Sequence, residues 1–277
     1  LGAEIDLALR SDLHGVLLMA GGADGPDERA GSLSDRLTSR LLRLVQSLAR
    51  RGQPLPGGLW IATHGAQPAG APPTGAGIGQ SPLWGLGRVV ALEQPQVWGG
   101  LVDLDGSAGD TADMQAAAEQ LLAELEGGDG EDQVAWRAGQ RYVARLQRTA
   151  RPPAQDVRLR ADATYLVTGG LGGLGLQVAR WLAQRGAGHL LLMGRRGLST
   201  DAAVQAVAEI ERQGTAVTVI AADVADEQAM TMLFARFGDD LPPLAGIVHT
   251  AADLSSAPVV DLDEERLQAM LRPKVQG

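Results

Sequence analysis

Three glycines that follow a short apolar stretch offer the clearest chemistry in the sequence. Gly169, Gly172 and Gly175 have the spacing G-x-x-G-x-x-G and come directly after YLVT. Such glycines permit a tight turn, and a helix that begins among them directs N–H groups and a positive dipole end toward a pyrophosphate. A chain with 37 glycines can produce this spacing by chance, but the apolar run before it and the helical period after it favour a dinucleotide site over a purely structural turn. The expected pyrophosphate segment is Thr168, Gly169, Gly170, Leu171, Gly172, Gly173, Leu174 and Gly175.

The ends of the next two strands indicate which dinucleotide would bind. Where a site for NAD places an acidic residue, this chain has Arg195 and Arg196 after Gly194. A guanidinium pairs with a ribose 2′-phosphate that a carboxylate would repel, so NADPH is favoured over NADH. Asp223, with Val224 beside it, is placed to accept a hydrogen bond from the adenine amine. An aspartate at a strand end is equally common as a helix N-cap, and both interpretations stay open.

A fourth strand end is expected beside the nicotinamide ribose. It carries His249, Thr250, Ala251 and Ala252. A catalytic histidine is one interpretation of His249. We favour a packed or hydrogen-bonded structural histidine, because the strand is apolar and no carboxylate partner is evident.

Metal chemistry is not expected. The other histidines of the chain show no metal-ligand spacing with one another or with carboxylates, and the chain has no cysteine. We therefore predict that no metal is bound.

Short apolar runs alternate with segments of helical period, which is the pattern of βαβ units. The expected strands are 14–21, 58–65, 99–105, 133–146, 163–169, 189–195, 216–223 and 244–251. The expected helices are 33–50, 82–93, 111–126, 173–186, 200–213, 226–237 and 263–271.

The paired prolines and mixed charges of residues 147–162 interrupt this pattern and indicate a linker. We place a structural domain at 1–150, the linker at 151–162 and a dinucleotide-binding domain at 163–277. LHGVLLMAGGAD (13–24) is similar to LAGIVHTAADLS (244–255), so the first half is interpreted as a shortened copy of the second. It contains no Gly-rich turn between a strand and a helix, and a supporting role is expected for it.

Composition excludes several classes of partner. The net charge is −9 and no basic run is present, which argues against nucleic acid. No apolar stretch approaches the roughly 20 residues of a membrane span, and without cysteine there is no disulfide framework. A globular cytoplasmic protein is expected. Because Leu1 stands where a methionine would begin a natural chain, we expect a piece of a longer polypeptide.

TGGLGGLG, GRRG, DV, HTAADL and PKVQG follow one another as in the ketoreductase domains of modular polyketide synthases, a branch of the short-chain dehydrogenase/reductase (SDR) superfamily. PLWGLGRVVALEQPQVWGGLVDLD and EDQVAWRAGQRYVARL also resemble the structural part of those domains, so the likeness spans nearly the whole chain. It implies an α/β fold of two Rossmann-like (SDR-type) doubly wound parallel-sheet subdomains. The first would be truncated and cofactor-free, and the second would hold NADPH and be incomplete at its C-terminus in this chain.

The resemblance also implies a reaction: a β-ketoacyl group on an acyl carrier protein is reduced to a β-hydroxyacyl group with NADPH, beside neighbouring synthase domains. The family motif K-V-x-G matches Lys274, Val275 and Gly277, so Lys274, the single lysine of the chain, would be catalytic. Its ammonium would hydrogen-bond the ribose and lower the pKa of a tyrosine proton donor. Neither Tyr142 nor Tyr165 begins a Y-x-x-x-K motif. The family's serine and tyrosine are therefore expected beyond Gly277.

Two departures from the family pattern affect these expectations. Ala252 and Asp253 stand where many relatives have glycine and an apolar residue. This difference affects where the nicotinamide ring would be placed. Residues 254–256 (LSS) replace the L-D-D triplet of one stereochemical class, and the chain leans toward the other. The alternative function is a non-catalytic ketoreductase-like scaffold, against which the intact Gly-rich segment argues. A different reductase or epimerase of the superfamily is disfavoured by the first half.

Overall fold

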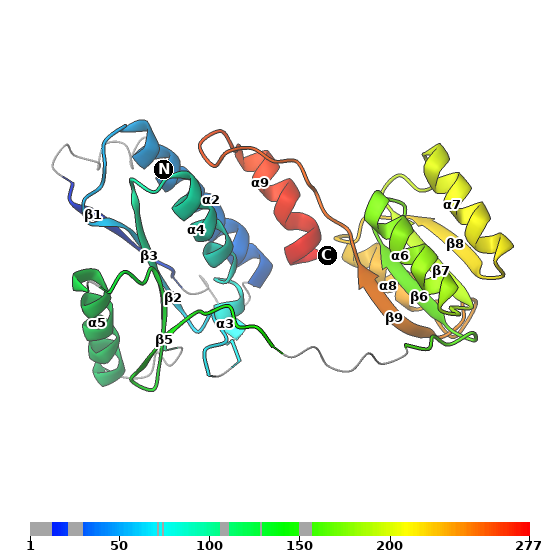
Figure 1. The fold of residues 1–277 in the computed structure, drawn as a ribbon, viewed down its shortest axis with the longest axis horizontal. Coiled ribbons are helices and arrows are strands. Elements are labelled where there is room, and N and C mark those ends of the chain that lie inside the picture. Colours follow the sequence, from blue (N-terminus) through cyan, green and yellow to red (C-terminus); the bar gives the residue numbers. More distant parts are fainter. Residues whose placement is uncertain are drawn as a thin grey trace. The chain divides into compact units, whose positions relative to one another are not determined.

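The computed structural model of the chain describes residues 13–21, 30–70, 72–73, 75–105, 111–127, 129–149 and 157–277 (Figure 1). Residue contacts divide the chain into two compact units. The first comprises Leu1–Arg148 together with Ser256–Leu267, and the second comprises Thr149–Ser255 with Gln268–Gly277. Within the described residues, no helix is long and apolar enough to cross a membrane.

The first unit is a five-stranded sheet with helices. Its elements in chain order are β1 (Gly15–Met19), α2 (Ala30–Arg50), β2 (Gly58–His64), α3 (Gly75–Ile78), α4 (Pro82–Glu93), β3 (Trp98–Leu104), α5 (Thr111–Glu126), β4 (Gln133–Arg137) and β5 (Gln140–Val143). The strand order is β1-β2-β3-β4-β5, with β1 to β4 parallel and β5 antiparallel to β4. Helix α2 buries Leu33, Leu37, Leu41 and Leu48 along one face, because residues four apart lie on the same side of a helix.

One strand prediction is wrong in this unit. The sequence pattern predicts a single strand over 133–146, but these residues contain the hairpin of β4 and β5. Ala138 and Gly139 both have positive φ angles, 49° and 73°, as a two-residue type I′ turn requires. The turn escapes sequence reasoning because alanine rarely adopts a positive φ, so Ala138 carries no turn signal.

The second unit holds a four-stranded parallel sheet. Its elements are β6 (Thr164–Thr168), α6 (Gly173–Gln184), β7 (His189–Gly194), α7 (Asp201–Arg212), β8 (Ala216–Ala221), α8 (Glu227–Phe234) and β9 (Leu244–His249), and the strand order is β8-β7-β6-β9. Every residue of β6 is buried. Leucines and valines of one sheet face pack with α6 and α7, and those of the opposite face pack with Leu233 of α8. Helices therefore cover both faces of this sheet, as in a doubly wound fold.

Residues Ser256–Leu267 lie within the predicted domain 163–277, and their contacts group them with the first unit. Gln46 of α2 donates from Nε2 to the carbonyls of Val259 and Leu262 at 3.1 and 2.7 Å. The amide of Val259 in turn donates to Glu93 Oε2 at 2.6 Å, and Val259 is 1% exposed. These contacts tie residues 256–267 to the helices of the first unit. Part of the predicted linker, 151–156, lies outside the described residues.

Helix α9 (Glu264–Leu271) follows this segment and continues directly into a π-helical turn, η1 (Arg272–Gln276). The sequence pattern predicts the helix over 263–271 but not the turn. Pro273 is the second residue of η1 and has no N–H, so it cannot continue the α-helical hydrogen-bond pattern of α9.

Candidate functional site

The turn from β6 into α6 is built so closely that side chains are excluded from it. Gly169 has a φ of 67°, and a Cβ there would lie 2.7 Å from the amide nitrogen of Ala251. A Cβ on Gly175 would overlap the carbonyl oxygen of Gly169. The amide of Gly170 is shared between the carbonyls of Val167 and Met193, at 3.2 and 3.1 Å. These glycines are therefore required by the backbone itself.

The start of α6 is open by comparison. Gly172 is the N-cap residue and provides no side-chain hydrogen bond to the first turn. A Cβ on Gly173 would meet nothing within 4 Å, and both residues are exposed. The amides of a first helical turn have no partner within the helix, and they point at whatever lies beyond its end. A pyrophosphate fits this surface, because backbone donors and the positive end of the helix dipole face it without intervening side chains.

The carboxyl ends of β7 and β8 lie side by side next to this turn. Gly194 pairs with Ala221, so Arg195 and Asp223 follow closely on neighbouring strands. Arg195 and Arg196 are exposed, and Asp223 is half-buried. Their positions suit the adenosine half of a dinucleotide.

Asp223 does not cap the helix that follows it. Asp226 is the N-cap of α8 and accepts from the amide of Ala229 at 3.0 Å, so the capping interpretation of Asp223 is wrong. Asp223 Oδ1 instead accepts from the amide of Ala225 at 3.0 Å. Its other oxygen, Oδ2, lies 3.3 Å from Nε of Arg272, a residue that sequence reasoning misses. Only its place two residues before Lys274 could have drawn attention to it.

The end of β9 is tied to the end of β6 by polar contacts. Nδ1 of His249 lies 2.8 Å from Oγ1 of Thr168. Thr250 donates to the carbonyl of Thr168 twice, from its amide at 2.9 Å and from its hydroxyl at 2.7 Å. The side chain of His249 thus forms a hydrogen bond with a hydroxyl of the neighbouring strand β6, as a structural histidine would. Ala251 lies against the Gly169 turn, and Ala252 is exposed beside it.

Lys274 is carried by the π-helical turn. This turn lies against the end of β8, because a Cβ on Gly277 would come within 2.7 Å of Val224 Cγ1. Lys274 itself is exposed. π-Helical turns are rare and are frequent at functional sites, where they redirect side chains. The structure thus brings the Lys274 turn to the same sheet edge as Asp223 and Val224.

Asp253, which departs from the family pattern, adds a negative charge near this edge. Its Oδ1 accepts from the amide and the hydroxyl of Ser255, at 2.8 and 2.6 Å. The pKa of the Asp253 carboxyl is lowered, first by the Ser255 hydroxyl, then by the Ser255 amide and also by the charge of Arg195. Asp253 therefore lies within electrostatic reach of Arg195.

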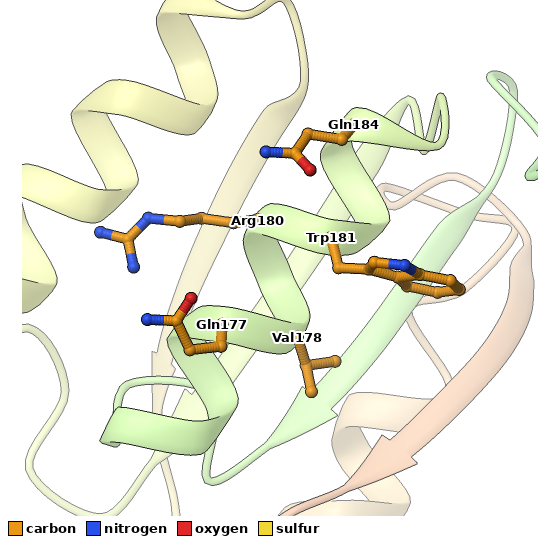
Figure 2. A pocket seen from close by; sticks show the side chains of 5 residues that line it. All are labelled: Gln177, Val178, Arg180, Trp181 and Gln184. Atoms are coloured by element: carbon orange, nitrogen blue, oxygen red, sulfur yellow. The ribbon is translucent and has the colours of Figure 1, made fainter.

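A surface pocket on α6 lies apart from this edge. Figure 2 shows the five side chains that line it, Gln177, Val178, Arg180, Trp181 and Gln184, projecting from the one helix. Arg180 pairs with Glu209 of α7 at 3.0 Å, and the guanidinium of Arg185 lies 5.2 Å from the Trp181 ring. The pocket belongs to the outer face of α6 and not to the turn that precedes the helix. Among the described residues, no group of three or more acidic or histidine side chains is arranged to hold a metal.

The matching sheet edge of the first unit is filled by its own polar groups. Asp103, at the end of β3, is fully buried. It accepts from the hydroxyl of Thr63 at 2.6 Å, from the amides of Ala66 and Gln67 at 2.9 Å each, and from the guanidinium of Arg137. At this edge the polar groups of the protein therefore bond to one another, whereas in an open dinucleotide site such groups would be available to a ligand.

Comparisons with known proteins agree with this arrangement. The KR domain family matches residues 163–277, and the family described as "Polyketide synthase extender module SpnB, Rossmann fold domain" matches residues 3–146. One of the polypeptides of the phenolphthiocerol/phthiocerol polyketide synthase of Mycobacterium tuberculosis is 40% identical over 219 residues, and the pikromycin polyketide synthase component PikAIII of Streptomyces venezuelae is 40% identical over 239. These matches cover 79% and 84% of this chain, but only 14% of each relative.

Solved structures are similar over the whole chain. An A1-type ketoreductase superposes with a TM-score of 0.82 at 36% identity, covering 99% of this chain and 57% of its own. The first ketoreductase of the tylosin synthase superposes with a TM-score of 0.80 at 31% identity, covering 100% and 56%. The chain belongs to the ketoreductase domains of modular polyketide synthases, which are oxidoreductases of the SDR superfamily. The predicted α/β, Rossmann-like fold class is confirmed.

Proposed function

We propose that the second unit binds NADPH and takes part in reducing a β-ketoacyl thioester, held on an acyl carrier protein, to the β-hydroxyacyl thioester. The observation that carries the proposal is the open N-terminus of α6 at Gly172 and Gly173, which is near the two arginines that follow β7. Backbone amides suit the pyrophosphate, and guanidinium groups suit the 2′-phosphate. The proposal places the domain in the cytoplasm, beside the carrier protein and neighbouring synthase domains.

The residues of this chain have distinct tasks in the proposed reaction. NADPH, when bound, supplies the hydride. Arg195 and Arg196 select the phosphorylated ribose, Asp223 accepts from the adenine amine, and the exposed ammonium of Lys274 donates to a ribose hydroxyl. A cation at Lys274 also lowers the pKa of a nearby tyrosine, which favours proton transfer to the ketone oxygen.

The two tyrosines of this chain do not serve as that proton donor. The hydroxyl of Tyr165 accepts from the amide of Arg160, and its ring is buried in the core on the α6 face. Tyr142 lies in β5 of the first unit and donates to Gln140. The proposal therefore assigns the role of proton donor to neither Tyr142 nor Tyr165.

The test is a titration of the chain with NADPH and NADH, followed by nucleotide fluorescence or calorimetry. We expect saturable binding with NADPH the tighter ligand. Arg195→Ala should weaken NADPH roughly ten- to a hundredfold, which corresponds to one hydrogen bond to a charged group, and should leave NADH nearly unchanged. Arg212→Ala, an exposed arginine in the last turn of α7, serves as the control. Equal affinities for the two nucleotides would contradict the choice of NADPH, and absence of binding would favour a scaffold.

A further inference from the structure

The turn that carries Lys274 is attached to the end of β8 at both of its ends. At its start, Nε of Arg272 lies 3.3 Å from Oδ2 of Asp223. Just past its end, Gly277 packs against Val224. Arg272 is thereby held at a defined position on the sheet edge, with about half of its side chain exposed.

This position is next to the proposed 2′-phosphate site. The last paired residues of β7 and β8 are Gly194 and Ala221. Arg195 comes one residue after the first of these and Asp223 two residues after the second, on strands that lie about 4.8 Å apart. Arg272, which sits on Asp223, brings a third guanidinium to the corner that Arg195 and Arg196 already occupy.

We propose that Arg272 is a specificity-determining residue of the dinucleotide site, which selects the 2′-phosphate together with Arg195 and Arg196. The inference rests on the proposed function and adds a residue to that same site. A ribose 2′-phosphate is a dianion or nearly so at neutral pH, so a cation beside the adenosine favours NADPH over NADH. The ion pair also offsets the charge of Asp223, which would otherwise repel the phosphate.

The charges around Arg272 determine how much its positive charge affects the binding of the 2′-phosphate. Asp223 and Asp253 bring two carboxylates near an edge that also carries Arg195 and Arg196. Arg272 adds a further positive charge to this edge, which also carries Lys274, and so shifts the balance toward the cations. The carboxylate of Asp223 keeps its ability to accept from an adenine amine, since a carboxylate has about four acceptor positions.

The ion pair itself contributes little to folding. Its two side chains are 51% and 32% exposed, and pairs of this kind add almost nothing to stability. A change at Arg272 should therefore appear in ligand selectivity while the fold is kept, which thermal unfolding of the variants checks.

The experiment measures the dissociation constants of NADPH and NADH for the chain at low salt, for wild type, Arg272→Ala and Arg272→Lys. Arg266→Ala is the matched control, because Arg266 is also an exposed arginine near an aspartate, 3.5 Å from Asp263. We expect Arg272→Ala to weaken NADPH about three- to tenfold, with NADH changed less than about twofold and the effect reduced in about 0.5 M salt. Arg272→Lys should retain most of the NADPH affinity, since it keeps the charge.

Two results would overturn the inference while the proposed function stands. In one, wild type prefers NADPH and Arg272→Ala weakens both nucleotides equally, which indicates that Arg272 only positions the turn. In the other, Arg272→Ala behaves as Arg266→Ala does. If wild type binds neither nucleotide, the proposed function fails and the inference fails with it.

Discussion

Removal of the buried carboxylate of Asp103 should strongly lower the stability of the first unit against unfolding. Asp103→Ala leaves the guanidinium of Arg137, only 12% exposed, without its counter-charge. It also strips the acceptor from the Thr63 hydroxyl and from two backbone amides. Breaking a buried ion pair on one side costs about 3–5 kcal/mol. With a urea m-value of about 2 kcal/mol/M for a domain of this size, the midpoint should fall by roughly 2 M.

Tryptophan fluorescence can follow this unit alone. Four of the five tryptophans, Trp60, Trp84, Trp98 and Trp136, lie in the first unit, and Trp181 lies in the second. In a Trp181→Phe background, urea unfolding reports only on the first unit, which avoids the two-state assumption for the whole chain. The control is Glu131→Ala, which removes the exposed ion pair with Arg145 and should leave the midpoint nearly unchanged.

The refuting result is specific. If Asp103→Ala lowers the midpoint no more than Glu131→Ala does, the network at the end of β3 does not hold the unit together. A double variant, Asp103→Leu with Arg137→Met, should recover much of the lost stability, because an apolar pair leaves no uncompensated charge. If the double variant is as unstable as Asp103→Ala, the cost arises from packing and not from charge.

Three single positions give further predictions. Gly175→Ala should abolish NADPH binding and destabilise the second unit, because its Cβ would overlap the carbonyl of Gly169; Gly173→Ala, with open space around it, should keep the fold in the same titration and unfolding assays. Ala138→Gly should stabilise the first unit by about 1 kcal/mol in urea, since it relieves a positive φ of 49°, and an unchanged midpoint would show that this turn is not strained. Burial lowers the pKa of His189 below its usual 6.5, so the unfolded chain binds the proton more readily, and the stability of the second unit should fall as pH drops below about 6.5. His189→Gln should flatten that pH dependence in melts followed by circular dichroism, and an unaltered slope would exclude His189 as its source.

The local parts of the fold could be predicted from the sequence. The expected strands 163–169 and 189–195 correspond to Thr164–Thr168 and His189–Gly194, because a short apolar run that ends at a glycine favours a buried strand. The glycine turn was recognisable for the same reason. One of its tight backbone contacts, that between Gly175 and Gly169, connects residues close in sequence.

The hairpin in 133–146 shows where local patterns mislead. Ala138 does not favour a positive φ, so it gives no sign of a turn in the sequence. The pairing of Val134 with Val143 and the other cross-strand pairs of the hairpin offset the conformational cost of the positive φ at Ala138. The sequence pattern does not show how much that pairing stabilises the hairpin, because the pairing depends on which strand is the partner.

The sequence by itself determined the fold class, the order of the strands along the chain and the residues that form the glycine turn, since these depend on neighbours a few positions apart. Only the tertiary structure decided that Gln46 and Glu93 bind residues 259–262, and that Arg272 meets Asp223. These contacts join residues that are 49 to 216 positions apart. Such pairs form only once the helices, strands and connecting segments have packed together, and no periodicity in the sequence records which residues will then meet.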